Sequence, residues 1–290
     1  MQRASKGDGP GRASFEARLC GLAPQDDGRD QVPWVSFRSR PVLTIIRSLV
    51  FNLLFYLNLL LLLTAALPTL LMPRRGILTM AKTWGRTSLW WLRVICGTRV
   101  EWRGLEKIPA VGCIVAAKHQ STWDTFALVP LFDDPTFLVK RELMWVPLFG
   151  WFMRKAGMIP IDRGARAQTI PAMMQRARAA LREGRQIVIF PEGTRRAAGA
   201  EPAYKFGVAR LYAETGAPCV PIALNSGLFW PRRKFLRHPG TIVIEILDPI
   251  PPGLDAKTFF QRLQSDIEQA TARLVAEGEL TRGVSRDSMT

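Results

Sequence analysis

A histidine followed five residues later by an aspartate is the pair best suited to chemistry in this chain. His119 is one of only two histidines among 290 residues, and one helical turn would bring the carboxylate of Asp124 back to its ring. A general base titrates near neutral pH, and a hydrogen bond to a carboxylate fixes its tautomer. Because no G-x-S-x-G nucleophile motif is present, we expect the base to activate a hydroxyl of the substrate. The alternative is a surface histidine near a helix start, with Asp124 as a local cap.

A turn that ends in an arginine follows the apolar run from Gln186 to Phe190. Phe190–Arg195 reads Phe-Pro-Glu-Gly-Thr-Arg, so a proline and a glycine restrict the backbone ahead of the guanidinium. Such a turn offers backbone N–H groups and a cation, a combination that suits phosphate. Gly157–Arg163 likewise ends an apolar run with a cation, and Lys205 adds another farther along the chain. Each of these turns, taken alone, is also compatible with an ordinary surface loop.

Short apolar segments alternate with helical periodicity from about Val100 onward. Six segments are predicted to be strands: Cys113–Ala117, Thr136–Val139, Met158–Ile161, Gln186–Phe190, Cys219–Leu224 and Thr241–Leu247. Helices are predicted from Ile170 to Leu181 with Gly184 as the stop, from Lys205 to Glu214, and from the cap Asp255 to about Leu274. This alternation is typical of an α/β fold with a largely buried sheet flanked by helices.

A long apolar stretch precedes the α/β region. Ser48–Met72 holds no charged residue, and about 20 apolar residues suffice to cross the hydrocarbon core of a bilayer as a helix. Pro68 and Pro73 interrupt the stretch, and Ile77–Cys96 then mixes tryptophans with cations, as interfacial helices do. Because basic residues flank the apolar run on both sides, we expect a membrane-embedded helical hairpin that enters one leaflet. A true span is the alternative, and a buried core helix fits the length and leucine content less well.

The net charge of +16 indicates an anionic partner. No helix-turn-helix, zinc-finger or RNA-binding signature is present, so we expect an acidic membrane surface and phosphorylated substrates, and no nucleic acid. The four cysteines are widely spaced and the two histidines lie far apart, so neither a disulfide framework nor a metal site is predicted. The expected segments are a disordered tail at 1–40, membrane-attaching helices at 41–98, an α/β domain at 99–278 and a C-terminal tail at 279–290.

The motifs together resemble one family, the glycerolipid acyltransferases. The chain is similar to the four sequence blocks of that family, in order and rough spacing, at His119…Asp124, Gly157…Arg163, Phe190–Arg195 and Val220–Ala223. The resemblance runs from about Gly112 to Leu224 and is greatest to the bacterial 1-acylglycerol-3-phosphate acyltransferases. Four ordered blocks make a specific signal, although any one of them alone is weak.

The resemblance implies a role for each block. His119 would be the catalytic base that deprotonates the acceptor hydroxyl, and Asp124 would orient it. The substrate-binding residues around the acceptor's phosphate would be Arg163, Glu192, Gly193, Thr194 and Arg195. Val220–Ala223 would line the acyl-donor side. One departure is Lys118, which stands where the family often has asparagine and places a cation beside the base.

The implied fold is an α/β acyltransferase domain preceded by a membrane-embedded helical hairpin. The implied reaction moves a fatty acyl group from acyl-CoA or acyl-carrier protein to the sn-2 hydroxyl of 1-acylglycerol-3-phosphate (lysophosphatidic acid), giving phosphatidic acid. It would take place among membrane lipids at the cytoplasmic face of the inner membrane, with no cofactor beyond the acyl donor.

Two other functions stay open at this point. One is the same chemistry on lyso-ornithine lipid or another lysophospholipid, and the other is a non-enzymatic basic protein of the membrane surface. The apolar stretch Trp145–Phe152 is predicted to be a core segment, with an acyl-chain pocket as its alternative.

Overall fold

The computed structural model describes residues 41–161 and 170–282, and the tail predicted at 1–40 lies outside them. A seven-stranded sheet organises the described chain, in the order β1-β7-β6-β2-β5-β3-β4. The strands are β1 Thr98–Arg103, β2 Cys113–Ala117, β3 Pro135–Lys140, β4 Ile159–Ile161, β5 Gln186–Ile189, β6 Cys219–Leu224 and β7 Gly240–Ile246. Neighbouring strands are parallel except for β6 and β7, which are antiparallel.

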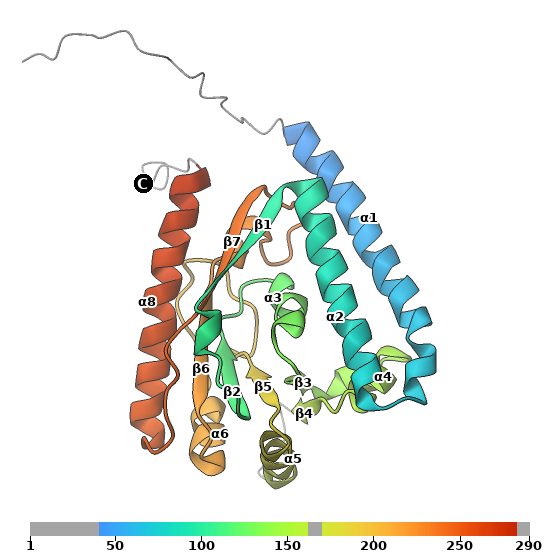
Figure 1. Ribbon diagram of the computed structural model, residues 1–290. Coiled ribbons are helices and arrows are strands. Elements are labelled where there is room, and N and C mark those ends of the chain that lie inside the picture. Colours follow the sequence, from blue (N-terminus) through green and yellow to red (C-terminus); the bar gives the residue numbers. More distant parts are fainter. Residues whose placement is uncertain (1–40, 162–169, 283–290) are drawn as a thin grey trace, which may run out of the picture. The chain divides into compact units, whose positions relative to one another are not determined.

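The centre of the sheet is buried on both faces, which is why its strands are almost continuous apolar runs. Every residue of β2 and β6 is buried, and both strands have the bounds that the sequence predicts. Side chains alternate between the faces: Val115 packs into the core on the side of α1 and α2, whereas Ile114 packs toward α5, α6 and α8. Figure 1 shows the same arrangement, with the hairpin on one side of the sheet and α8 on the other.

Helices cover both faces of this sheet and confirm the predicted α/β class. The α-helices after the hairpin are α3 Trp123–Ala127, α4 Phe149–Lys155, α5 Ile170–Arg182, α6 Gly207–Thr215, α7 Ser226–Phe229 and α8 Ala256–Arg282. Short 3₁₀ turns occur at η3 Leu105–Lys107, η4 Val129–Leu131 and η5 Arg141–Trp145.

The predicted helix boundaries have identifiable causes. Gly184 adopts a φ of 77° two residues after α5 ends, a conformation that glycine accommodates without strain. Asp255 caps α8, because its Oδ1 accepts the backbone N–H groups of Lys257 and Thr258, both at 3.0 Å. The helix continues to Arg282, four residues past the predicted domain boundary at 278.

A helical hairpin precedes the sheet. α1 (Pro41–Ala65) and α2 (Arg74–Trp91) run antiparallel and side by side, joined through the 3₁₀ turn η1 Leu67–Leu70, and the π-helical turn η2 Leu92–Cys96 follows α2 (Figure 1). Phe51 and Phe55 on the inner face of α1 pack against Trp230, with ring centroids 5.4 and 5.7 Å away. This aromatic contact attaches the hairpin to the α/β part of the molecule.

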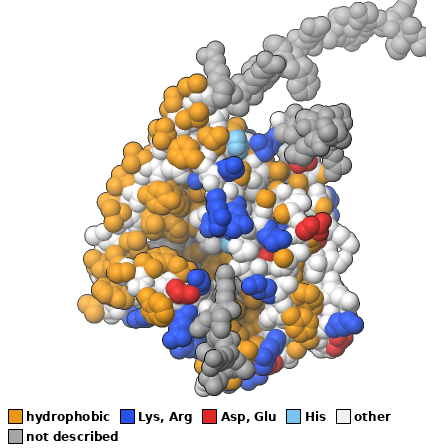
Figure 2. All heavy atoms as spheres, turned by 180° about the vertical axis from the view of Figure 1, so that it is seen from behind, with side chains coloured by type: hydrophobic (Ala, Val, Ile, Leu, Met, Phe, Trp, Pro, Cys, Tyr) orange, Lys and Arg blue, Asp and Glu red, His pale blue; other side chains and the backbone are white. Residues whose placement is uncertain are grey.

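The outer face of α1 is a continuous apolar surface. Leu53 and Leu60 are 70% and 60% exposed, and the helix from Val42 to Ala65 is long and apolar enough to cross a membrane. Figure 2 shows hydrophobic side chains gathered along this side of the molecule. Because an apolar face of this size is costly in water, it indicates membrane association. Whether α1 spans the bilayer or enters one leaflet stays a prediction.

Candidate active site

The histidine and aspartate of the first motif are in contact at the carboxyl edge of the sheet. His119 follows the end of β2 by two residues, and Asp124 lies in the first turn of α3. Nδ1 of His119 is 3.0 Å from Oδ2 of Asp124, whose side chain is completely buried. The same oxygen accepts the backbone N–H groups of Gln120 (2.7 Å) and Ser121 (2.9 Å). Because an ionised carboxylate oxygen can only accept hydrogen bonds, Nδ1 is the donor in this contact, which leaves Nε2 of His119 as a proton acceptor.

Two further residues fix this pair. Phe190 stacks on the imidazole of His119, with ring centroids 3.9 Å apart and planes 19° from parallel. The Ser226 hydroxyl donates to Oδ1 of Asp124 at 2.5 Å. Ser226 begins α7 just after β6, and β6 is the parallel neighbour of β2, so both chains leave the sheet at the same edge. Sequence reasoning missed Ser226, although its place two residues after a predicted strand was a usable signal.

The turn that follows β5 lies against the loop of His119. Gly193, Thr194 and Arg195 line the same cavity as the imidazole. A backbone bond from the N–H of Arg196 to the carbonyl of His119 (2.8 Å) joins the two loops. Arg195 also donates from Nη1 to the hydroxyl of Thr122. A guanidinium and an imidazole thus line the same cavity, which suits an anionic substrate that carries a hydroxyl.

The side chain of Glu192 is directed into the interior of the protein. Its carboxylate is buried away from the cavity, with Oε1 3.0 Å from Nζ of Lys118 and Oε2 accepting the backbone N–H of His119 at 3.4 Å. Burial raises the pKa of Glu192, and the neighbouring ammonium of Lys118 opposes that rise. The Glu192 side chain therefore forms an internal ion pair with Lys118, and its expected part in shaping the phosphate site stays a prediction.

The block predicted on the acyl-donor side does not line the described cavity. Val220–Ala223 were expected on the acyl-donor side, but they form the middle of β6, where neighbouring strands and helices bury them completely. Arg163 lies outside the residues that the structure describes, so its part in phosphate binding stays a prediction. Lys205 does reach the site's edge, since its side chain packs 3.2 Å from where a Cβ on Gly193 would stand.

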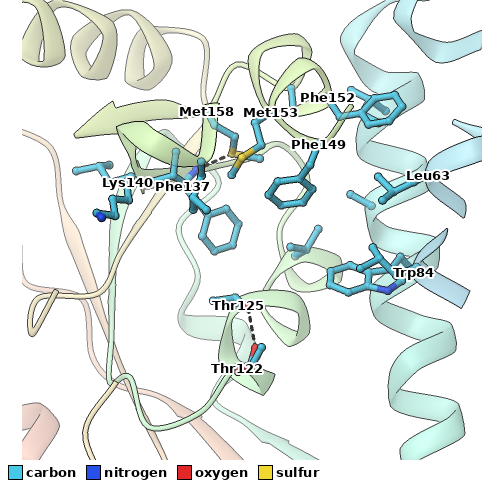
Figure 3. A pocket seen from close by; sticks show the side chains of 18 of the residues that line it. Leu63, Trp84, Thr122, Thr125, Phe137, Lys140, Phe149, Phe152, Met153 and Met158 are labelled. Carbon is cyan, nitrogen blue, oxygen red and sulfur yellow. Dashed lines mark hydrogen bonds between the residues drawn. The ribbon is translucent and has the colours of Figure 1, made fainter. Parts of the chain in front are cut away.

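The cavity beside His119 has a volume of about 610 Å³ and is mainly apolar. Its walls come from both helices of the hairpin, from β3 and from α4. Figure 3 shows aromatic and aliphatic side chains directed into it, among them Leu63, Trp84, Phe137, Phe149, Phe152 and Met153. A mainly apolar cavity of this size can hold a hydrocarbon chain whose reactive end meets the imidazole.

The prediction of a core segment at Trp145–Phe152 is confirmed for Phe152, which is 4% exposed and packs in a buried apolar cluster, and wrong for Trp145 and Trp151. Phe149 and Phe152 line the cavity, whereas Trp145 and Trp151 are 64% and 53% exposed. The reason is the short helix α4, which sends positions three apart to one side and Trp151 to the other. That spacing was the available signal for the two cavity residues.

The described residues offer few groups for a bound metal. Within 41–161 and 170–282, no group of three histidine, cysteine or acidic side chains comes close enough together to hold an ion. Cys113 and Cys219 lie buried in β2 and β6 as free thiols, and burial raises the pKa of Cys113 to about 11.

Known proteins are similar to this chain in sequence and in fold. The sequence model of the acyltransferase family matches residues 99–225. A 1-acyl-sn-glycerol-3-phosphate acyltransferase of Pseudomonas aeruginosa is 36% identical over 196 residues, which cover 68% of this chain and 75% of that protein. The human 1-acyl-sn-glycerol-3-phosphate acyltransferase alpha is 30% identical over 169 residues, or 57% of this chain and 60% of that protein.

A solved structure has the same α/β fold as this chain. The crystal structure of the 1-acyl-sn-glycerophosphate acyltransferase PlsC from Thermotoga maritima superposes with a TM-score of 0.64 at 22% identity, covering 79% of this chain and 97% of that one. The residues matched by the family model include both loops of the site, 119–124 and 190–195.

Proposed function

The chain belongs to the acyltransferase family, and from this we propose that it moves a fatty acyl group to the sn-2 hydroxyl of 1-acylglycerol-3-phosphate. The product is phosphatidic acid. The observation that carries the proposal is one cavity that joins the His119–Asp124 pair, the guanidinium of Arg195 and an apolar interior. Relatives named as 1-acyl-sn-glycerol-3-phosphate acyltransferases support this acceptor. Family membership also removes the alternative of a non-enzymatic membrane-surface protein.

The chemical step begins at Nε2 of His119. This nitrogen takes the proton of the acceptor hydroxyl while the hydroxyl oxygen attacks the thioester carbonyl carbon of the donor. The carbon–sulfur bond then breaks, an ester remains, and the protonated imidazole returns its proton to the leaving thiolate. Asp124 stabilises the imidazolium that exists between the two transfers, because its buried carboxylate faces Nδ1.

The acceptor's phosphate is assigned to the turn after β5. The Arg195 guanidinium supplies charge, and Gly193 and Thr194 supply neighbouring polar groups on the same wall of the cavity. Arg163 is the second cation that the sequence predicts for this role. Bound in this way, the glycerol hydroxyl lies near His119 while a fatty chain occupies the apolar interior.

Either acyl-CoA or acyl-carrier protein is the proposed donor, and neither a metal nor a further cofactor is needed for the thioester exchange. Both donors are anionic, which suits a chain with a net charge of +16. The hairpin would hold the site at the bilayer surface, where lysophosphatidic acid is dissolved among membrane lipids. We place the α/β domain on the cytoplasmic face of the inner membrane.

An acceptor panel tests this function. Purified protein in detergent is given labelled acyl-CoA together with lysophosphatidic acid, another lysophospholipid or lyso-ornithine lipid, and the labelled products are separated. We expect phosphatidic acid from the first acceptor. Product from lyso-ornithine lipid alone would keep the chemistry and overturn the acceptor. An inactive preparation is repeated with acyl-carrier protein as donor, and inactivity with both donors on every acceptor would overturn the proposed function.

A further inference from the structure

A buried group of charges lies directly behind the catalytic histidine. Lys118 is only 2% exposed, and its Nζ is 3.0 Å from Oε1 of Glu192 and 2.6 Å from Oε1 of Glu268. Glu268 belongs to α8, 150 positions away in the chain. Tyr204 donates its hydroxyl to the same oxygen of Glu268 at 2.8 Å. We call Lys118, Glu192 and Glu268 the charge clasp.

The charge clasp contains one cation and two carboxylates. Either glutamate alone can neutralise Lys118, but neither glutamate has another described cation within ion-pair distance. Removal of one partner from a buried pair is strongly destabilising, because it leaves a charge that neither water nor a counter-ion compensates. Lys118 is therefore the member whose loss affects both carboxylates at once.

The charge clasp is connected to the catalytic base through the main chain. Oε2 of Glu192 accepts the N–H of His119 at 3.4 Å, and the carbonyl of His119 accepts the N–H of Arg196 at 2.8 Å. Both backbone groups of the base are thus held by the turn that carries Arg195. The N–H of Lys118 itself bonds to the carbonyl of Ile222 in β6 at 2.9 Å. The distance between the imidazole and the phosphate-binding guanidinium depends on these contacts.

We propose that Lys118 and Glu268 are positioning residues for the transfer reaction. They act through Glu192 to keep the imidazole of His119 at a fixed distance from the guanidinium of Arg195. The idea rests on the proposed function. In this assignment Glu192 holds the two loops together and does not bind the acceptor. Lys118 is only 2% exposed, and Glu268 on α8 supplies a second carboxylate for it beside Glu192.

Single and double variants distinguish the charge clasp from a set of independent contacts, because in the clasp the effect of losing one charge depends on whether its partners remain. Lys118→Met strands two carboxylates, and we expect kcat to fall about tenfold or more. Glu192→Gln and Glu268→Gln each leave one ion pair with Lys118, so each should lower kcat no more than about threefold. Glu192→Gln combined with Glu268→Gln strands the buried ammonium and should lose far more activity than the product of the two single losses.

The double variant Lys118→Met/Glu192→Gln tests the same ion pair by removing both the ammonium and the buried carboxylate. Only Glu268 then remains, and it is partly exposed and bonded to Tyr204, so kcat should recover several-fold relative to Lys118→Met. If Glu192 bound the acceptor instead, Glu192→Gln would raise the KM for lysophosphatidic acid, and adding it to Lys118→Met would not restore activity. That pattern, or simple additivity in both double variants, would overturn the inference.

Thermal unfolding gives a readout that needs no substrate. In Lys118→Met the pKa of Glu192 rises further, so its charged form is disfavoured and stability should fall as pH rises from 5 to 8. Among the described residues, the groups that act on the Glu192 carboxyl are Lys118, Glu268, Tyr204 and the backbone of His119, and of these Lys118 alone is a cation. The trend should be absent when Glu192→Gln is added. A Lys118→Met protein with the wild-type pH trend would contradict the inference.

An exposed ion pair supplies the matched control. Lys107 and Asp248 are 2.9 Å apart with side chains 34% and 82% exposed, so Lys107→Met and Lys107→Met/Asp248→Asn should leave kcat and unfolding unchanged. If the wild type transfers no acyl group, the proposed function fails while the unfolding series still decides whether the charge clasp exists. If Lys118→Met does not fold at all, we expect Lys118→Met/Glu192→Gln to fold, because the buried carboxylate without a partner has been removed. If neither variant folds, the inference is contradicted.

Discussion

The hydroxyl of Ser226 donates to Oδ1 of Asp124 at 2.5 Å, although 102 positions separate the two residues in the chain. The bond places α7 behind the catalytic pair and completes the hydrogen bonds of a buried carboxylate. Asp124 then has fixed donors on both oxygens, and His119 has one orientation. A base held in this way needs no rearrangement before it accepts a proton.

Ser226→Ala should lower kcat by about 3- to 10-fold, because one donor to a buried charge is lost while His119 keeps its remaining contacts. The KM for both substrates should stay unchanged. Steady-state rates with the acceptor and donor varied in turn measure the effect. Ser265→Ala removes an exposed hydroxyl on α8 and serves as the control. A Ser226→Ala enzyme with wild-type kcat would show that the bond has no part in catalysis.

Asp124→Asn should lower kcat by about 10²- to 10⁴-fold, since the amide cannot accept all the donors that the carboxylate accepts. Its NH₂ group would face the N–H groups of Gln120 and Ser121 or the ring of His119. Circular dichroism establishes that the variant is folded before rates are compared. Retention of activity within about threefold would contradict the role of Asp124 as the partner that orients the base.

Arg195→Gln should raise the KM for the phosphorylated acceptor by about 10- to 100-fold, because a charged hydrogen bond to phosphate is lost. Arg195→Lys should restore only part of the affinity, since an ammonium cannot reproduce the planar fork of a guanidinium. Arg196→Gln is the neighbouring control: its guanidinium bonds to the carbonyl of Glu201 and does not line the cavity. A larger KM effect at Arg196 than at Arg195 would reverse the assignment.

Phe149→Ala should extend the range of fatty chains that the enzyme accepts, because it removes an aromatic wall of the cavity that Figure 3 shows. Competition between labelled substrates of different chain length measures the preference. Trp151→Ala removes an exposed ring from the same helix and should leave the preference as it is. The same shift in both variants would mean that the cavity does not hold the chain.

Charges placed on the outer face of α1 should release the protein from membranes. Leu53→Asp with Leu60→Asp costs about 2.5–3.5 kcal/mol for each residue at the centre of a bilayer. Sedimentation of washed membranes with and without high salt measures attachment. Release of the wild type by salt alone would contradict an apolar attachment through this helix.

The fold could be predicted from sequence where burial is complete. Residues 113–117 and 219–224 form strands at the centre of the sheet, so nearly every side chain is apolar and the bounds are visible in the sequence. β1 was missed because it lies at the sheet edge, where Thr98–Arg103 mixes charged and apolar residues. The cap at Asp255 and the stop at Gly184 were predictable since both are local effects.

Only those contacts of the site that join residues close together in the sequence could be predicted. The pairing of His119 with Asp124 needs one turn of chain, whereas the contact of Ser226 with Asp124 depends on which strands are neighbours. The direction of Glu192 was not visible either, because adjacent residues of a turn can face opposite ways. Its true partner, Lys118, was noticed only as a departure from the family pattern.

The role of His119 as the base is tested most directly by the rate of phosphatidic acid formation from labelled acyl donor and lysophosphatidic acid, measured for equal amounts of folded wild-type protein and His119→Ala. We expect product with the wild type and a rate at least about 10²-fold lower in the variant, since the base that takes the hydroxyl proton is gone. Equal rates would show that His119 is not the base, and the chemistry assigned to this cavity would be wrong.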